Sequence, residues 1–275
     1  MLLGKLWNKI LATISIINII VILHHLFTRL NQGGKKNIKL IILVTIYVFT
    51  CALRSIWPRA DGPGLCIHDN YVSTPFVGRC FTTIAEISFS IFVVSVTNII
   101  LESFKSMNGI NVIQKLNNSM VIFISIAQIF CWIGIITQDP SYNVIEESIW
   151  TIFGTVMLVI YLTLYSKIDI LPSTPELKKI KSIIPIILIV CTIYILFMTY
   201  NDVPMYFKRA KKQKENNVQY NSLYDGIQEM KKCKKVTSSY QEWKNDIPWL
   251  TFYFTFTVWG TIYILKWVEK FQKLR

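Results

Sequence analysis

The segment from Ser182 to Tyr200, SIIPIILIVCTIYILFMTY, decides the fold, because no charged side chain interrupts it. A helix of about 20 mostly apolar residues spans the ~30 Å hydrocarbon core of a bilayer. Six further segments have the same character, at residues 10–28, 39–57, 80–101, 119–138, 148–166 and 247–265. A membrane β-barrel would instead alternate over segments of about 10 residues. The sequence therefore predicts an all-α polytopic integral membrane bundle of about seven transmembrane helices, forming a single domain over residues 1–275.

The composition excludes other classes of protein. Hydrophobic residues make up 52% of the 275 residues and charged residues only 16%, against about 25% charged residues in an ordinary soluble domain. A disordered chain needs few apolar residues and dense charge, so that class is excluded. A soluble globular domain is disfavoured for the same reason.

The first apolar segment resembles a secretory signal peptide in one respect, because Lys5 and Lys9 precede it. It is longer than the apolar region of such a peptide, which has about 7–15 residues, and no small-residue cleavage site follows. We therefore expect residues 10–28 to form a membrane helix.

The distribution of basic residues leaves the orientation open. With side A defined as the side of the N-terminus, the short connections place more Lys and Arg on the opposite side, B, which favours B as the cytoplasmic side. The basic connection at residues 203–246 lies on side A and reverses this count. An outside N-terminus is slightly favoured, and the membrane, whether cellular or that of a virus or its host, is not identified.

The connection 203–246 is predicted to lie outside the membrane and to contain two short helices. Residues 203–214 combine apolar side chains with five Lys or Arg residues, which suits the membrane interface. Residues 222–235 place Leu223, Ile227 and Met230 on one helical face. The alternative is a solvated basic loop.

The formal net charge of +13 raises the question of a nucleic-acid partner. The basic residues gather at the ends of the apolar segments, so the expected partner is the lipid bilayer with its anionic head groups and not nucleic acid. Protein partners are unknown.

A polar stripe runs along the third apolar segment. It consists of Arg79, Thr83, Glu86, Ser90 and Thr97, whose spacing puts them on one helical face. A charge inside a span is costly and usually faces the bundle interior or a cavity. Glu86 can be a structural ion-pair residue, with Arg79 or Arg54 as its partner, a group lining a solute or proton path, or a catalytic carboxylate. Glu86, Arg79, Thr83 and Arg54 are therefore candidate solute-path or buried polar residues.

The connection between the second and third segments carries further candidates. Pro58, Gly62, Pro63 and Gly64 impose turns on it. Its candidate functional residues are Arg59, Asp61, His68 and Asp69, to which Asp202 is added from the same predicted side. An ordered cap held by Arg–Asp pairs is the alternative. Because most acidic residues lie on or towards side A, we predict a polar vestibule there.

The cysteines divide into two groups. Cys51, Cys131 and Cys191 lie within apolar segments and are expected to be small core residues. Cys66, Cys80 and Cys233 lie on side A. If that side is oxidising, Cys66 can form a disulfide with Cys80 or with Cys233.

Motifs for metal or cofactor chemistry are absent. The histidines, His24, His25 and His68, form neither an H-x-x-x-H nor an H-E-x-x-H pair, and the sequence contains no Gly-rich phosphate loop and no G-x-S-x-G motif. We therefore predict no metal and no cofactor, and no catalytic residue can be assigned.

Three functions are compatible with these features. The preferred one is a carrier or channel for a small polar or charged solute, whose path runs from side A past Arg79, Thr83 and Glu86. The second is a lipid-modifying enzyme that uses Glu86 or the loop residues. The third is a non-catalytic receptor or membrane-organising protein.

Overall fold

The computed structural model describes residues 2–32, 37–60, 64–172 and 174–274. Within them the chain is an all-α bundle, which confirms the predicted fold class, and six helices are long and apolar enough to cross a membrane. They cover Gly4–Asn31, Ile38–Ile56, Pro75–Phe104, Ile110–Thr137, Pro140–Ile170 and Pro175–Glu215. The chain is therefore an integral membrane protein.

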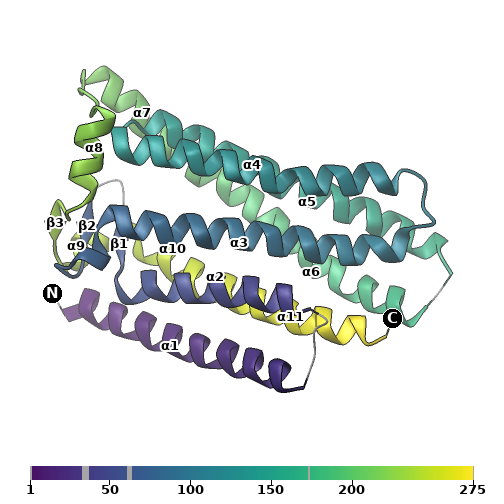
Figure 1. Cartoon of the computed structure of the whole chain (residues 1–275). Coiled ribbons are helices and arrows are strands. Elements are labelled where there is room, and N and C mark those ends of the chain that lie inside the picture. Colours follow the sequence, from purple (N-terminus) through teal and green to yellow (C-terminus); the bar gives the residue numbers. More distant parts are fainter. Residues whose placement is uncertain (1, 33–36, 61–63, 173, 275) are drawn as a thin grey trace. The chain divides into compact units, whose positions relative to one another are not determined.

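Its elements are coloured along the sequence in Figure 1 and group into two compact units, Met1–Phe92 with Asn221–Glu269 and Val93–Tyr220 with Lys270–Arg275.

The seventh predicted segment is helical but is not among these six. α10 (Ile247–Phe252), the π-helical η5 (Tyr253–Thr257) and α11 (Val258–Gln272) follow one another without a break. We call residues 247–272 the C-terminal stretch. Its many Thr, Tyr and Trp residues make it less apolar than the Ile-rich helices.

In the first unit, α1 (Leu2–Asn31) packs its polar face inward and its apolar face outward. Its packed face recurs every third or fourth residue and consists of Asn8, Leu11, Ser15, Asn18 and Ile22, all buried. Its outward face carries Leu6, Ile10, Ile17, Ile20 and Phe27, each more than half exposed. Water would make such an outward face costly, whereas lipid tails solvate it.

The C-terminal stretch lies alongside α1 and runs in the same direction (Figure 1, yellow and purple). The Trp7 indole donates a hydrogen bond to Thr251 Oγ1 (2.8 Å), the Trp259 indole donates to Asn18 Oδ1 (3.1 Å), and the Arg29 guanidinium group pairs with Glu269 Oε2 (2.6 Å). The partners are separated by 244, 241 and 240 residues. A nearly constant separation requires two parallel helices in register.

A small sheet closes one end of the first unit. β1 (Arg59–Ala60) pairs antiparallel with β2 (Leu65–Cys66), and β2 pairs parallel with β3 (Lys235–Val236). A disulfide joins Cys66 to Cys233. The end of α2 (Ile38–Ile56) lies here too, because Asn8 of α1 donates a hydrogen bond to the Ser55 carbonyl (3.0 Å). We call this region, residues 57–60, 64–74 and 231–243 with the adjoining helix ends, the disulfide end.

The second unit contains the end of α3 (Pro75–Leu101) with η2 (Glu102–Phe104), α4 (Ile110–Thr137), α5 (Pro140–Lys167) with η3 (Ile168–Ile170), and α6 (Pro175–Phe197). Its core is built from Val94, Met120, Ile124, Phe153 and Met157. Gly154 lets α5 approach α6 closely, since a Cβ atom there would lie 2.9 Å from the Tyr194 ring.

The helix predicted at residues 203–214 is present, but as a continuation of α6. α6 passes through the π-helical η4 (Met198–Asp202) into α7 (Val203–Glu215) without a break, and α7 packs against α5. In the first unit, α8 (Leu223–Met230) is shorter than the predicted helix at 222–235, with Met230 buried and Leu223 exposed. The four-residue α9 (Tyr240–Trp243) follows β3.

Candidate functional site

The part of the polar stripe of α3 from Arg79 to Ser90 belongs to the first unit and enters its interior. Arg79 is only 4% exposed, and its guanidinium group lies 3.4 Å from Glu86 Oε2. Thr83, between them on the same face, is half-buried, while Ile84 on the opposite face is exposed. Of the two partners considered for Glu86, Arg79 therefore forms an ion pair with it.

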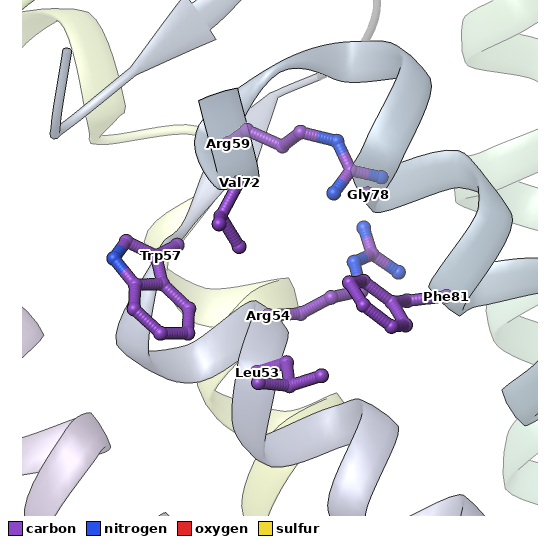
Figure 2. Close-up of a pocket in the computed structure, with 7 residues that line it drawn as sticks. All are labelled: Leu53, Arg54, Trp57, Arg59, Val72, Gly78 and Phe81. Carbon is purple, nitrogen blue, oxygen red and sulfur yellow. The ribbon is translucent and has the colours of Figure 1, made fainter. Parts of the chain in front are cut away.

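Two further arginines line a pocket at the disulfide end of the first unit. The pocket is bounded by Leu53, Arg54, Trp57, Arg59, Val72, Gly78 and Phe81. Figure 2 shows the Arg54 and Arg59 guanidinium groups pointing toward one another beside Gly78 and Phe81. In this conformation the pocket is too narrow to hold a water molecule.

The position of Arg59 depends on a glycine. Arg59 lies on β1, is 3% exposed and donates a hydrogen bond to Thr82 Oγ1 (3.5 Å). Its guanidinium group fills the place that a Cβ atom on Gly78 would take. Only glycine at position 78 leaves room for it, so the first turn of α3 is shaped around this side chain.

The Arg54 side chain connects the pocket to the buried interior. Its guanidinium group lies over the Phe254 ring, 5.3 Å from the ring centre, as in a cation–π contact. Arg54 and Glu86 both act electrostatically on the Cys51 thiol and on the Tyr253 hydroxyl, so these groups surround one region. We call Arg54, Arg59, Arg79 and Glu86 the arginine cluster.

The other sequence candidates have different surroundings. His68 shares a hydrogen bond with Asn8 Oδ1 (3.1 Å) and so helps to tie the loop to α1, whereas Asp69 is exposed. Asp61 lies outside the described residues. Asp202 belongs to the second unit, where its carboxyl group lies near that of Glu147 of α5.

The disulfide settles which of the two predicted pairings forms. Cys66 pairs with Cys233, at a Cα–Cα distance of 5.9 Å, and Cys80 is a free thiol. The pairing of Cys66 with Cys80 is therefore wrong. The physical reason is the parallel pairing of β2 with β3, which brings Cys233 to Cys66, whereas Cys80 lies within α3.

The polar residues of α1 were not predicted from the sequence as structural contacts. Asn8 supports both the α2 terminus and the loop through Ser55 and His68, and Asn18 holds the C-terminal stretch through Trp259. Their signal was available, because Asn8, Ser15 and Asn18 recur at the spacing of one helical face in a largely apolar segment. Gly78 was also missed, since a residue without a side chain gives no chemical signal.

Within the part of the chain that the structure describes, no group of three or more His, Cys, Asp or Glu residues is arranged to hold a metal ion. Comparison with protein-family models, with curated proteins and with solved structures finds no match for this chain.

Proposed function

We propose that the chain crosses the membrane seven times, with the C-terminal stretch as the seventh span. The contacts with α1 near residues 7, 18 and 29 extend along nearly the whole length of that helix. If α1 spans the bilayer, a helix paired with it in register spans it as well. The moderate hydropathy of the stretch suits a position beside the polar face of α1.

In this topology the disulfide end faces an oxidising compartment, because disulfides persist there and are rare in reducing cytosol. The start of α1 belongs to the same end, since the Trp7 and Trp243 ring centres are 6.0 Å apart. Arg29 and Glu269 lie at the other end of α1. The N-terminus is then extracytoplasmic and the C-terminal stretch ends at the cytoplasmic side.

Within this topology, the protein acts as a carrier or channel for a small anionic solute that binds between Arg54 and Arg59. The observation that carries the proposal is the convergence of two guanidinium groups in one pocket (Figure 2). An anion placed between two guanidinium groups is attracted by both, and this attraction is strong in weakly polarisable surroundings. The planar guanidinium group presents its N–H donors in a fork that matches carboxylate and phosphate groups.

The pocket walls indicate what accompanies the anionic group. Trp57, Val72 and Phe81 supply apolar and aromatic surface next to the two cations. A small carboxylate or phosphate with an apolar body uses both kinds of surface. Since the pocket is narrow in this conformation, binding requires the Arg54 and Arg59 side chains to move apart.

Arg79 provides the next anion partner further along α3. It is held by Glu86 in this conformation. An anion that leaves the pocket can replace Glu86 at Arg79, and the released carboxylate then opposes entry of a second anion. The Arg79–Glu86 pair therefore acts as a gate in the proposed path.

Flux into proteoliposomes tests the proposal, with benzoate, phosphate and chloride as anionic probes and potassium as the cationic probe. Wild-type protein is expected to pass an anion in preference to potassium. Arg54→Gln should lower that flux about tenfold, the equivalent of 1.4 kcal/mol, while Arg54→Lys retains part of it. Lys9→Gln, which removes an exposed charge near the start of α1, is the matched control and should leave flux unchanged.

Formation of the Cys66–Cys233 disulfide shows that each variant has folded. Potassium flux without anion flux in the wild-type protein would contradict the proposal. So would unchanged anion flux in a correctly folded Arg54→Gln variant.

A further inference from the structure

The continuous helix that ends with α7 is too long to lie entirely within a bilayer. It runs from Pro175 to Glu215, which is 41 residues. At 1.5 Å per residue this is about 60 Å, roughly twice the hydrocarbon core. A large part of the helix must therefore lie beyond the hydrocarbon region, and the side chains of α7 show where it emerges.

α7 has a packed face and a basic face. Tyr206, Ala210 and Gln213 are half-buried at helical spacing, as expected for the face that packs against α5. The exposed positions carry Phe207, Lys208, Arg209, Lys211, Lys212 and Lys214. We call these six residues the basic face of α7. One acidic residue, Glu215, offsets part of the charge through a long contact with Lys211 (3.9 Å).

Exposed aromatic rings lie at the membrane-side edge of this basic face. Tyr200 is 73% exposed and Phe207 is 61% exposed, immediately before Lys208. Aromatic rings followed by basic residues mark the boundary between hydrocarbon and head groups in membrane helices. A ring this exposed is unfavourable in water and favourable in the interfacial layer.

We infer that the basic face of α7 docks onto the head groups of anionic phospholipids. Lys and Arg side chains near such a surface gain attraction from each lipid charge, and the Phe207 ring inserts beside them. A soluble polyanion would satisfy the charges but would leave Phe207 and Tyr200 in water, so the exposed rings favour lipid. In the segment from Glu215 to Cys233, all of which the structure describes, no helix is long enough to span a membrane. On the proposed topology, the leaflet involved is therefore the one on the side of the disulfide end.

The test uses the full chain in nanodiscs of phosphatidylcholine with a minority of phosphatidylglycerol. Mass spectrometry of the released complex counts the lipids that stay bound. Phosphatidylglycerol should be enriched over its share of the nanodisc by roughly fivefold. The triple variant Lys208→Gln, Lys212→Gln, Lys214→Gln should lose most of that enrichment.

A second triple variant, Lys231→Gln, Lys232→Gln, Lys244→Gln, removes the same charge from exposed residues of the first unit. It should retain the enrichment. Equal loss in both variants, or no enrichment in the wild type, would overturn the inference. Heparin binding that only the α7 variant loses, with lipid enrichment unchanged, would identify a soluble polyanion as the partner and overturn it too. Since none of these changes touches the arginine cluster, the outcome is independent of anion flux.

Discussion

A Cβ atom on Gly78 would occupy the space that the Arg59 guanidinium group fills. Arg59 lies on β1 and Gly78 lies on α3. The absence of a side chain on Gly78 therefore determines where the positive charge of Arg59 is held. This relationship leads to the first prediction.

Gly78→Ala should displace the Arg59 guanidinium group and abolish anion binding at the pocket. Alanine favours a helix over glycine by about 1 kcal/mol, but overpacking a buried site costs about 1–3 kcal/mol, so unfolding free energy should fall by about 1 kcal/mol. Thermal unfolding in detergent and equilibrium binding of benzoate measure the two effects. Gly260→Ala is the control, because a Cβ there meets nothing within 4 Å. If Gly78→Ala matches the wild type in both measurements, Arg59 is not held in this place.

Asn18 and Trp259, which are joined by a hydrogen bond, should be energetically coupled. In a double-mutant cycle of Asn18→Ala with Trp259→Phe, we expect a coupling energy of about 0.6 kcal/mol, the average for polar contacts between membrane helices, and no more than about 1.7 kcal/mol. Reversible unfolding in mixed micelles provides the free energies. A cycle of Trp7→Phe with Trp259→Phe, whose hydrogen bonds have separate partners, should be additive. Additivity in both cycles would show that the parallel pairing with α1 is not formed at this point.

An engineered glycosylation site reports the side of the membrane reached by α7. Val218→Thr creates an N-x-T sequon whose acceptor is Asn216, and both positions are exposed. In a eukaryotic secretory system we expect one glycan at Asn216 and none on a sequon appended after Arg275. The natural sequon at Asn117 should stay unmodified, because Asn117 is fully buried. A glycan on the appended sequon alone would reverse the proposed orientation.

Removal of the disulfide should destabilise the first unit. The bond closes a loop over a separation of 167 residues. Disulfides stabilise by about 2–4 kcal/mol, and we expect the lower figure for Cys233→Ser, because membrane spans already restrict the unfolded chain. Cys80→Ser should have little effect. Peptide mapping without reductant should recover a Cys66–Cys233 cross-link, and a cross-link that includes Cys80 would be contrary to the structure.

One acidic residue of α8 should add a small pH dependence. Hydrogen bonds from Lys234 and Asn221 hold the pKa of Glu229 below its ordinary value of 4.5, and the Lys234 amine is 3.1 Å away. A carboxylate with a lowered folded pKa stabilises the fold above its unfolded pKa, and the contribution disappears as the pH falls through the lowered value. Because the pair is exposed, the effect should stay below about 1 kcal/mol.

Melting curves of the wild type and of Glu229→Gln, recorded at pH 7 and pH 3, measure this effect. The variant should lose less stability on acidification than the wild type. Glu215→Gln serves as a control, since Lys211 is more distant from Glu215 than Lys234 is from Glu229. An identical loss in the wild type and in Glu229→Gln would rule out a contribution from this pair.

The sequence predicted the helical architecture well, because solvation by lipid depends mainly on the length and composition of a segment. The run Ile183–Val190 needs no partner to be recognised as membrane-spanning. The stripe from Arg79 to Glu86 was also visible, since its residues are neighbours on one helix. The C-terminal stretch is harder to classify, because its polarity matches a polar partner face that only the packed structure shows.

Relationships over long sequence separations could not be predicted. Cys66 had two possible partners, and only the pairing of β2 with β3 selects Cys233. The position of the Arg59 guanidinium group depends on the space left by the missing side chain of Gly78. The pattern of residue types does not show which glycine leaves such a space. The pocket is therefore a property of tertiary packing, whereas the spans are properties of local composition.

The pairing of α1 with the C-terminal stretch has a consequence for biosynthesis. Asn18 leaves the ribosome early, but its partner Trp259 is made 241 residues later. Until then α1 waits in the bilayer with a polar amide that lacks its final partner, whereas Asn8 can already bond the Ser55 carbonyl and His68. Termination of translation just before residue 247 would yield a product that keeps its Ile-rich spans but lacks the C-terminal stretch that packs against α1. We expect membrane quality control to degrade such a product.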